Sequence, residues 1–81
     1  MIRVEVYGKR DCCLCDEAKA ILVKVRREVP FDLREVDIES APELYATYKE
    51  RIPLVFVNGR PAFKFRVDEE VLRRRLAREP A

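Results

Sequence analysis

The hydrophobic pattern changes period twice within the first forty residues, and this constrains the fold more than any other feature of the chain. Residues 2–7 alternate apolar and polar, which is typical of a strand with one buried face. Apolar residues then recur at helical spacing, which predicts a helix over about 13–28 that Pro30 ends. Residues 31–38 read as a second strand. A strand, helix and strand of these lengths favour a right-handed crossover between two parallel strands.

The second half of the chain predicts four further elements. A short helix is expected over about 41–50, and the continuously apolar stretch 53–57 suits a strand that is covered on both faces. Asn58-Gly59 is a strong signal for a two-residue hairpin. Residues 62–67 alternate as an edge strand, and 69–78 predict a final helix. The predicted order is therefore β-α-β-α-β-β-α, an α/β fold with a four-stranded mixed sheet flanked by helices.

Two polar residues are predicted to cap the later helices. Ser40 with Glu43 three residues on has the spacing of a capping box, and Asp68 can cap the last helix. On these two helices the apolar residues expected to face inward are Leu44, Tyr45, Tyr48, Val71, Leu72 and Leu76. One strand pattern fits less well, because Arg3 and Glu5 occupy one face of a strand that should be central.

Composition limits the classes of protein to which the chain can belong. Its 81 residues predict one domain, 1–81, and the net charge of +2 argues against a dedicated nucleic-acid binder. The Arg-rich run 73–78 is interpreted as an exposed helix face, where arginines favour the helix dipole. No apolar run approaches about 20 residues and no signal-peptide pattern opens the chain, so we expect a cytoplasmic protein without a membrane segment. The absence of histidine and tryptophan, with abundant charge, resembles the composition of a thermophile's protein.

All three cysteines lie in the run "CCLC" at 12–15. Structural disulfides are rare in the cytosol, so this cluster indicates redox or metal chemistry. Cys12 falls where a strand turns into a helix, and the unpaired N–H groups and dipole of the helix start favour a thiolate there. Lys9 and Arg10 just upstream act in the same direction. Cys15 is one helical turn deeper, near disulfide range, so Cys12 is predicted to attack and Cys15 to resolve.

Two features complicate this assignment. Asp11, Asp16 and Glu17 cluster at the same helix start and repel a thiolate, so we expect the pKa of Cys12 to be lowered only moderately. Cys13 faces another side of the helix, and adjacent cysteines rarely pair. It is either a small or exposed residue without a role, or an alternative redox partner or metal ligand.

The chain resembles the glutaredoxins in two segments. "VYGKRDCCLCDEAKAIL" looks like their active-site strand, loop and helix, and "RIPLVFVNG" looks like the segment that carries their cis-proline. The resemblance implies a thioredoxin-like fold with sheet order 2-1-3-4. It also implies that Pro53 is cis and lies beside Cys12, and that Ile52 pairs with the main chain of a bound substrate. A trans proline that opens a strand is the alternative.

The same resemblance suggests contacts for glutathione. Lys9 matches the family position that meets a glutathione carboxylate, although a solvated loop lysine is the alternative. Glutaredoxins usually follow the hairpin with Gly-Gly and an Asp, whereas this chain has "FKFRVDEE", in which Asp68 is the nearest, offset candidate. The run "GKRDCCLCDEA" is closer to short glutaredoxin-like proteins with a Cys-x-Leu-Cys-Asp motif. Tyr7, at the end of the first strand, either lines the cleft or is buried.

Three functions remain open from the sequence. The first is a thiol–disulfide oxidoreductase that acts through Cys12 and Cys15 on disulfides of proteins or small thiols. It would hold no bound cofactor, act as a monomer, and be reduced by glutathione or a thioredoxin-reductase-like partner. The second is a carrier of an iron–sulfur cluster or other metal, although three thiols without histidine fall short of the four ligands of a closed zinc site. The third is a thioredoxin-fold module that only binds partners.

Overall fold

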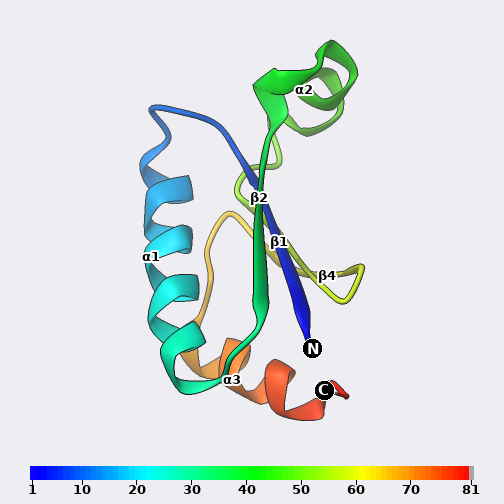
Figure 1. Cartoon of the computed structure of the whole chain (residues 1–81). Coiled ribbons are helices and arrows are strands. Elements are labelled where there is room, and N and C mark those ends of the chain that lie inside the picture. The colour runs from blue at the N-terminus through cyan, green and yellow to red at the C-terminus, as the bar shows by residue number, and fades with distance from the viewer. Residues whose placement is uncertain (81) are drawn as a thin grey trace.

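The computed structural model describes residues 1–80, and Ala81, the last residue of the expected domain, lies outside the described part. The described chain contains every predicted strand and helix in the predicted order, with one short 3-10 helix in addition. The elements are β1 (Arg3–Gly8), α1 (Cys13–Glu28), β2 (Asp32–Asp37), η1 (Ile38–Ser40), α2 (Pro42–Tyr48), β3 (Leu54–Val57), β4 (Arg60–Lys64) and α3 (Glu69–Arg78). Figure 1 shows α1 beside the sheet, α3 beneath it and α2 at the opposite end.

The sheet has four strands in the order β2-β1-β3-β4, which confirms the predicted order 2-1-3-4. β1 pairs parallel with β2 and antiparallel with β3, and β3 pairs antiparallel with β4. The β3–β4 connection is the predicted hairpin. Asn58 and Gly59 both have positive φ, 49° and 81°, which is the backbone that a two-residue hairpin of this kind requires.

The main core lies between one face of the sheet and the helices α1 and α3. The even residues of β1, with Val55 and Val57 of β3, pack against the apolar stripes of these two helices. Its fully enclosed members, each with 2% or less of its surface exposed, are Val4, Val6, Ala18, Leu22, Val25, Phe31, Val55, Val57, Leu72 and Leu76. This face of the sheet is the one that the alternation at 2–7 predicts to be buried.

The opposite face is covered only near one end. Tyr7 projects from this face, and its ring lies 4.9 Å from the ring of Tyr48 on α2 and 5.2 Å from that of Phe56 on β3. Further along β1, Arg3 is exposed and Glu5 is half-buried. The two charged residues in a central strand are therefore explained by a sheet face that stays partly open. The expectation that β3 is covered on both faces was wrong for Phe56, which is half-buried.

Three local predictions were wrong. The Ser40–Glu43 capping box does not form, because Ala41 is the N-cap of α2, Pro42 fills its first turn, and Ser40 Oγ donates instead to the carbonyl of Asp37. Tyr45 and Val71 were expected to face inward but are 39% and 42% exposed. β4 also begins and ends earlier than predicted.

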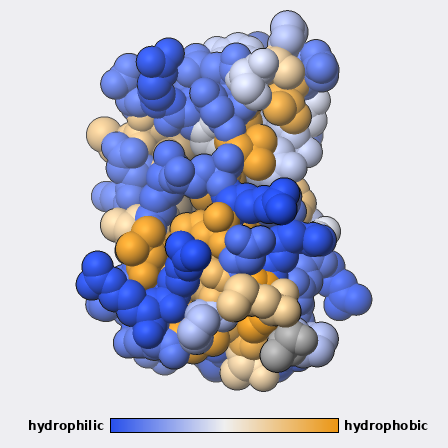
Figure 2. All heavy atoms as spheres, viewed as in Figure 1, coloured by the Kyte–Doolittle hydropathy of each residue, from blue (hydrophilic) through white to orange (hydrophobic). Residues whose placement is uncertain are grey.

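The hydropathy of the surface agrees with this packing. Figure 2 shows charged and polar residues over much of one side of the molecule, with smaller apolar areas between them. Within residues 1–80, no helix combines the length and apolar character needed to cross a bilayer.

Candidate functional site

The site is built where β1 turns into α1. Cys12 has an extended backbone, φ −118° and ψ 106°, and is the N-cap residue of α1. Its Sγ accepts a hydrogen bond from the Cys15 main-chain N–H at 3.2 Å, and the Cys12 carbonyl accepts from Asp16 N at 3.0 Å. The sulfur thus takes the place that an oxygen occupies in an ordinary helix cap. The same N–H group can stabilise negative charge on this sulfur.

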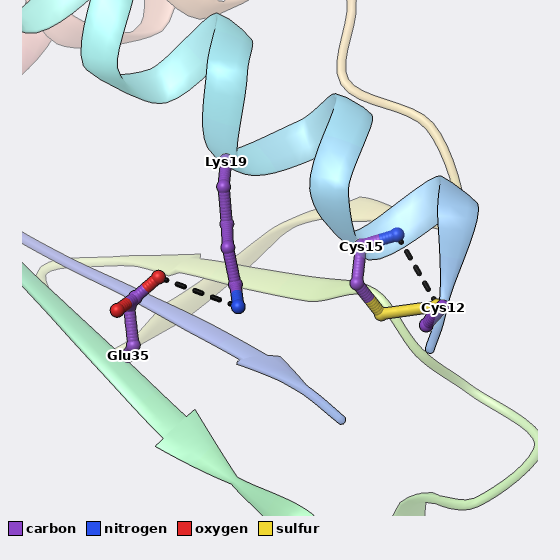
Figure 3. Close-up of a disulfide and its surroundings, with 4 residues drawn as sticks. All are labelled: Cys12, Cys15, Lys19 and Glu35. Carbon is purple, nitrogen blue, oxygen red and sulfur yellow. Dashed lines mark hydrogen bonds and ion pairs between the residues drawn. A yellow bond between two sulfur atoms is a disulfide. The ribbon is translucent and has the colours of Figure 1, made fainter. Parts of the chain in front are cut away.

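Cys12 and Cys15 form a disulfide across the first turn of α1, with Cα atoms 5.2 Å apart (Figure 3). The two cysteines differ in exposure. Cys15 is completely buried, whereas Cys12 is half-buried. This difference follows from the helix, because a residue one turn further along faces the sheet. It places the more exposed cysteine at the helix start and its partner behind it.

Gly8 lies against the buried sulfur, and reasoning from the sequence missed it. A Cβ at this position would stand 3.0 Å from Cys15 Sγ and 3.3 Å from Cys15 Cβ, which is closer than real Cβ contacts normally come. The last residue of β1 therefore has to lack a side chain for α1 to bring Cys15 onto the sheet. The signal was a glycine that ends a strand four residues before the first cysteine.

A second segment, far away in the sequence, completes the site. The Ile52–Pro53 peptide bond is cis, the geometry that the resemblance implies. Ile52 is buried and packs in a small cluster with Cys15 and Ile38, against which half-buried Tyr7, Cys12, Leu44 and Tyr48 also pack. This cluster brings together the end of β1, the start of α1 and the residues that lead into β3.

Tyr7 takes part in this cluster, so it is placed beside the thiols and is partly buried. Burial, with the negative charge of Glu5 and the neighbouring Tyr48, raises the pKa of the Tyr7 phenol above its usual value of 10.0. Its hydroxyl therefore stays protonated at neutral pH and can donate a hydrogen bond.

Lys9 does not line the same hollow as Pro53. It lines a surface hollow of about 490 Å³ between the β1–α1 loop, α1 and the end of β2, together with Gly8, Arg10, Asp11, Asp16, Lys19, Glu35, Val36 and Asp37. Within it, Lys19 on α1 points toward Glu35 on β2 and forms an ion pair of 3.4 Å (Figure 3). Ile52 and Pro53 do not line this hollow, so the structure does not bring Lys9 and Pro53 into one pocket.

Cys13 and Asp68 lie outside the cluster around the disulfide. Cys13 is exposed and is not disulfide-bonded. Asp68 is the N-cap of α3, as predicted, and its Oδ1 accepts a hydrogen bond from Val71 N at 3.0 Å. Across residues 1–80, no group of three or more His, Cys, Asp and Glu side chains is arranged to hold a metal ion.

Comparison with known proteins gives a consistent family. The family described as "Glutaredoxin-like domain (DUF836)" matches residues 3–77. An uncharacterized protein of Mycobacterium tuberculosis is 31% identical over 81 residues, covering 94% of this chain and 84% of the relative. A structural-genomics target protein from X. campestris has a similar structure, with a TM-score of 0.77 and 28% identity over 95% of this chain and 99% of that chain. Thioredoxin from Fasciola hepatica shares the fold, with a TM-score of 0.64 and 21% identity over 95% of this chain and 79% of that one.

Proposed function

Because this chain belongs to the glutaredoxin-like domain family (DUF836), we propose that it is a thiol–disulfide oxidoreductase that works through Cys12 and Cys15. The observation that carries the proposal is the asymmetry of the pair. Cys12 is only half-buried and its sulfur accepts a hydrogen bond from a main-chain N–H at a helix start, whereas Cys15 is completely buried within bonding distance of it. A disulfide that only stabilised the chain would need no difference in access between its two sulfurs.

The proposed reaction begins with the reduced protein. The Cys12 thiolate attacks one sulfur of a substrate disulfide, so that a Cys12–substrate disulfide forms and the other half of the substrate leaves as a thiolate. The Cys15 thiol then loses its proton and attacks Cys12 Sγ. The substrate leaves as its second thiol, the protein keeps the Cys12–Cys15 disulfide, and two electrons have passed to the substrate. The protons given up by Cys12 and Cys15 end on the two released thiols.

Proton transfer in this cycle needs a route other than histidine, because the chain has none. Asp16 follows Cys15 directly and lines the hollow that Gly8 and Lys9 also line. We propose that water in this hollow, or a carboxylate of its wall, takes the Cys15 proton. Gly8 connects this hollow with Cys15, since it lines the hollow and lies against the buried sulfur.

The proposed substrates are disulfides of proteins or small thiols. Ile52 precedes β3 and has no place in the β1–β3 ladder, so its main chain is offered to an extended substrate segment. Lys9 is proposed to contact a carboxylate of glutathione, as co-substrate or reductant, with Asp68 as the second candidate contact. A thioredoxin-reductase-like partner is the alternative source of electrons. We propose that the protein acts in the cytoplasm, as a monomer and without a bound cofactor.

The test is a redox equilibration of the wild type with Cys12→Ser, Cys13→Ser and Cys15→Ser. Each protein is equilibrated against ratios of reduced to oxidised glutathione and of dithiothreitol, trapped with an alkylating reagent and weighed by mass spectrometry. The wild type and Cys13→Ser are expected to gain and lose one intramolecular disulfide at the same ratio. Cys15→Ser should trap a mixed disulfide on Cys12. If Cys13→Ser alone lost the intramolecular disulfide, the pairing would be wrong.

A second measurement separates catalysis from binding alone. The reduced wild type should reduce a simple disulfide such as hydroxyethyl disulfide, while Cys12→Ser should not. Failure of the wild type in this reaction would leave a binding module as the better description.

A further inference from the structure

We propose that Phe65 is a substrate-contacting residue, and that it makes the redox site favour disulfides whose cysteine neighbours a large apolar side chain. The inference rests on the proposed oxidoreductase function. It adds a specificity determinant that lies outside both segments through which the chain resembles glutaredoxins.

The backbone of Phe65 is the first observation. Its φ is +71°, in the left-handed region that bulky residues with a side chain rarely adopt. The other positive-φ residues within 1–80 are Asp11, Asn58 and Gly59, residue types that tolerate this region well. Such strain persists only where the surroundings impose it, and it concentrates at functional sites.

The exposure of Phe65 is the second observation. The side chain is 42% exposed, so the strained backbone does not serve to bury an aromatic ring in the core. It holds the ring at the surface, with Lys64 Nζ 5.0 Å from the ring centroid. If the Phe65 side chain had no role, glycine or asparagine at this position would relieve the backbone strain without loss of core packing.

The position of Phe65 links it to the redox site. Its main-chain N–H donates to the carbonyl of Pro53 at 2.7 Å, next to Ile52 in the cluster that contains Cys12 and Cys15. Phe65 also shares a small hollow of about 130 Å³ with Leu14, the residue immediately before Cys15. Phe65 is therefore bonded to the segment that carries the cis-proline and shares a hollow with the first turn of α1.

The chemistry of this surface indicates the occupant. The hollow has apolar walls from Leu14, Ala18, Ile21, Phe65 and Val67, with the charged residues Glu17 and Arg66 also lining it, and its volume suits one side chain rather than a folded surface. Lys64 Nζ lies over the ring, and Arg66 forms an exposed ion pair of 3.9 Å with Glu17. The occupant is therefore an extended peptide segment with an apolar residue beside its half-cystine and an acidic residue nearby.

The test compares two peptide disulfides that differ at one position. Each peptide carries one glutamate and one cysteine in a mixed disulfide with 2-mercaptoethanol, and the residue after the cysteine is either Phe or Ser. Single-turnover rate constants are measured with fully reduced protein, so no recycling reductant is needed. Every rate constant is divided by that of the same protein with hydroxyethyl disulfide. The quantity compared is therefore the preference, which is the ratio of the values for the Phe and Ser peptides, and not the overall activity.

The wild type is expected to favour the Phe peptide by about tenfold, the low end of the discrimination that an apolar pocket achieves. Phe65→Asn keeps a residue that tolerates positive φ but removes the apolar surface, and its preference should fall to about onefold. Phe65→Leu should keep most of the preference. Val71→Asn, which alters an equally exposed apolar residue on α3, should retain that of the wild type.

The possible results separate the two proposals. If the wild type reduces hydroxyethyl disulfide but treats both peptides alike, or if Phe65→Asn keeps the full preference, the role of Phe65 is wrong and the oxidoreductase function stands. If the wild type reduces none of the three disulfides, the oxidoreductase function fails and the role of Phe65 fails with it.

Discussion

The Cys15 main-chain N–H donates a hydrogen bond of 3.2 Å to the sulfur of Cys12, so the second cysteine of the pair supplies the helix N–H that caps the first. The two residues of this hydrogen bond are close together in the sequence. The bond depends on Cys12 having the extended backbone of an N-cap residue. When the disulfide is reduced, the same N–H faces a thiol that can lose its proton. Several properties of the protein should follow from this arrangement and from the contacts around it.

Alkylation of Cys12 should report the effect of the helix start on its sulfur. In Cys13→Ser/Cys15→Ser, where Cys12 is the only thiol, the rate with iodoacetamide is expected to reach half of its plateau value below about pH 8.5, the pKa of a free thiol. In Cys12→Ser/Cys15→Ser, the exposed Cys13 is the only thiol and is not the N-cap residue, so its profile is the reference for the comparison. Equal profiles for the two proteins would show that the contact has no influence on reactivity.

Gly8→Ala should destabilise the protein, because the new Cβ would meet Cys15 Sγ at 3.0 Å. Overpacking of this kind typically costs about 1–3 kcal/mol, measured here as the free energy of unfolding in urea. The matched background is Cys15→Ala, which removes the sulfur that the methyl group would meet. The cost of Gly8→Ala should be smaller in that background, and an unchanged cost would mean that the clash lies elsewhere.

Substitutions of Asp68 should separate its helix cap from its proposed contact with glutathione. Asp68→Ala removes the hydrogen bond to Val71 N and should cost about 1 kcal/mol of unfolding free energy. Asp68→Asn keeps a capping side chain and should stay close to the wild type in stability. If Asp68 also binds glutathione through its charge, Asp68→Asn should raise the KM for glutathione while the unfolding free energy stays constant. A KM equal to that of the wild type would leave the residue as a cap alone.

Acid should weaken the contact between α1 and α3. Arg73 donates hydrogen bonds to Glu28 on α1 and to Glu69 on its own helix, and Lys24 also bonds Glu69. The bond from Arg73 lowers the pKa of Glu28 below its usual 4.5, and the bonds from Lys24 and Arg73 lower that of Glu69. Folding therefore favours the ionised carboxylates, so this stabilisation is present above pH 4.5 and is lost as pH falls through the lowered values.

The measurement is the free energy of unfolding from pH 7 to pH 2 for the wild type, Arg73→Met and Arg74→Met. Arg73→Met should be less stable than the wild type at pH 7, and the difference should shrink toward zero at pH 2, where both carboxyls are protonated. High salt should shrink it as well. Arg74 takes part in none of the ion pairs found in residues 1–80, so Arg74→Met should follow the wild type at every pH. A pH-independent difference for Arg73→Met would point to lost packing instead of charge.

The parts of the site that could be predicted are those determined by residues within one or two helical turns of each other in the sequence. The first strand, the loop and the helix from about Cys13 follow from a change of hydrophobic period at one place, although the strand was predicted over 2–7 and reaches Gly8 in the structure. The spacing of Cys12 and Cys15 places one sulfur at the helix start and the other a turn deeper, whatever the rest of the fold does. The caps show the limit of local signals. Asp68 caps its helix as predicted, whereas Ser40 lost its predicted role because a 3-10 helix precedes α2.

It was harder to predict which side of each helix is buried and which is exposed. Tyr45 and Val71 have the spacing of inward residues, but each lies at the margin of its helix's apolar stripe and remains exposed. The open face of the sheet had a visible sign in Arg3 and Glu5. That sign could not say which element covers Tyr7, since this depends on where α2 docks.

The sequence by itself determined the order of elements and the hairpin and predicted the Cys12–Cys15 pair, because each depends on residues close together in the chain, whereas the sheet order 2-1-3-4 was implied by the resemblance to glutaredoxins. Only the tertiary structure decided that Gly8 touches Cys15, that Ile52 packs beside both thiols and that Phe65 is held to the carbonyl of Pro53. Ile52 is far from the two thiols in the sequence, Gly8 meets Cys15 because of how closely α1 approaches β1, and Phe65 bonds to Pro53 just beyond the last paired residues of the β3–β4 hairpin. These contacts are set by the packing of the whole sheet against its helices, and no local pattern records that packing.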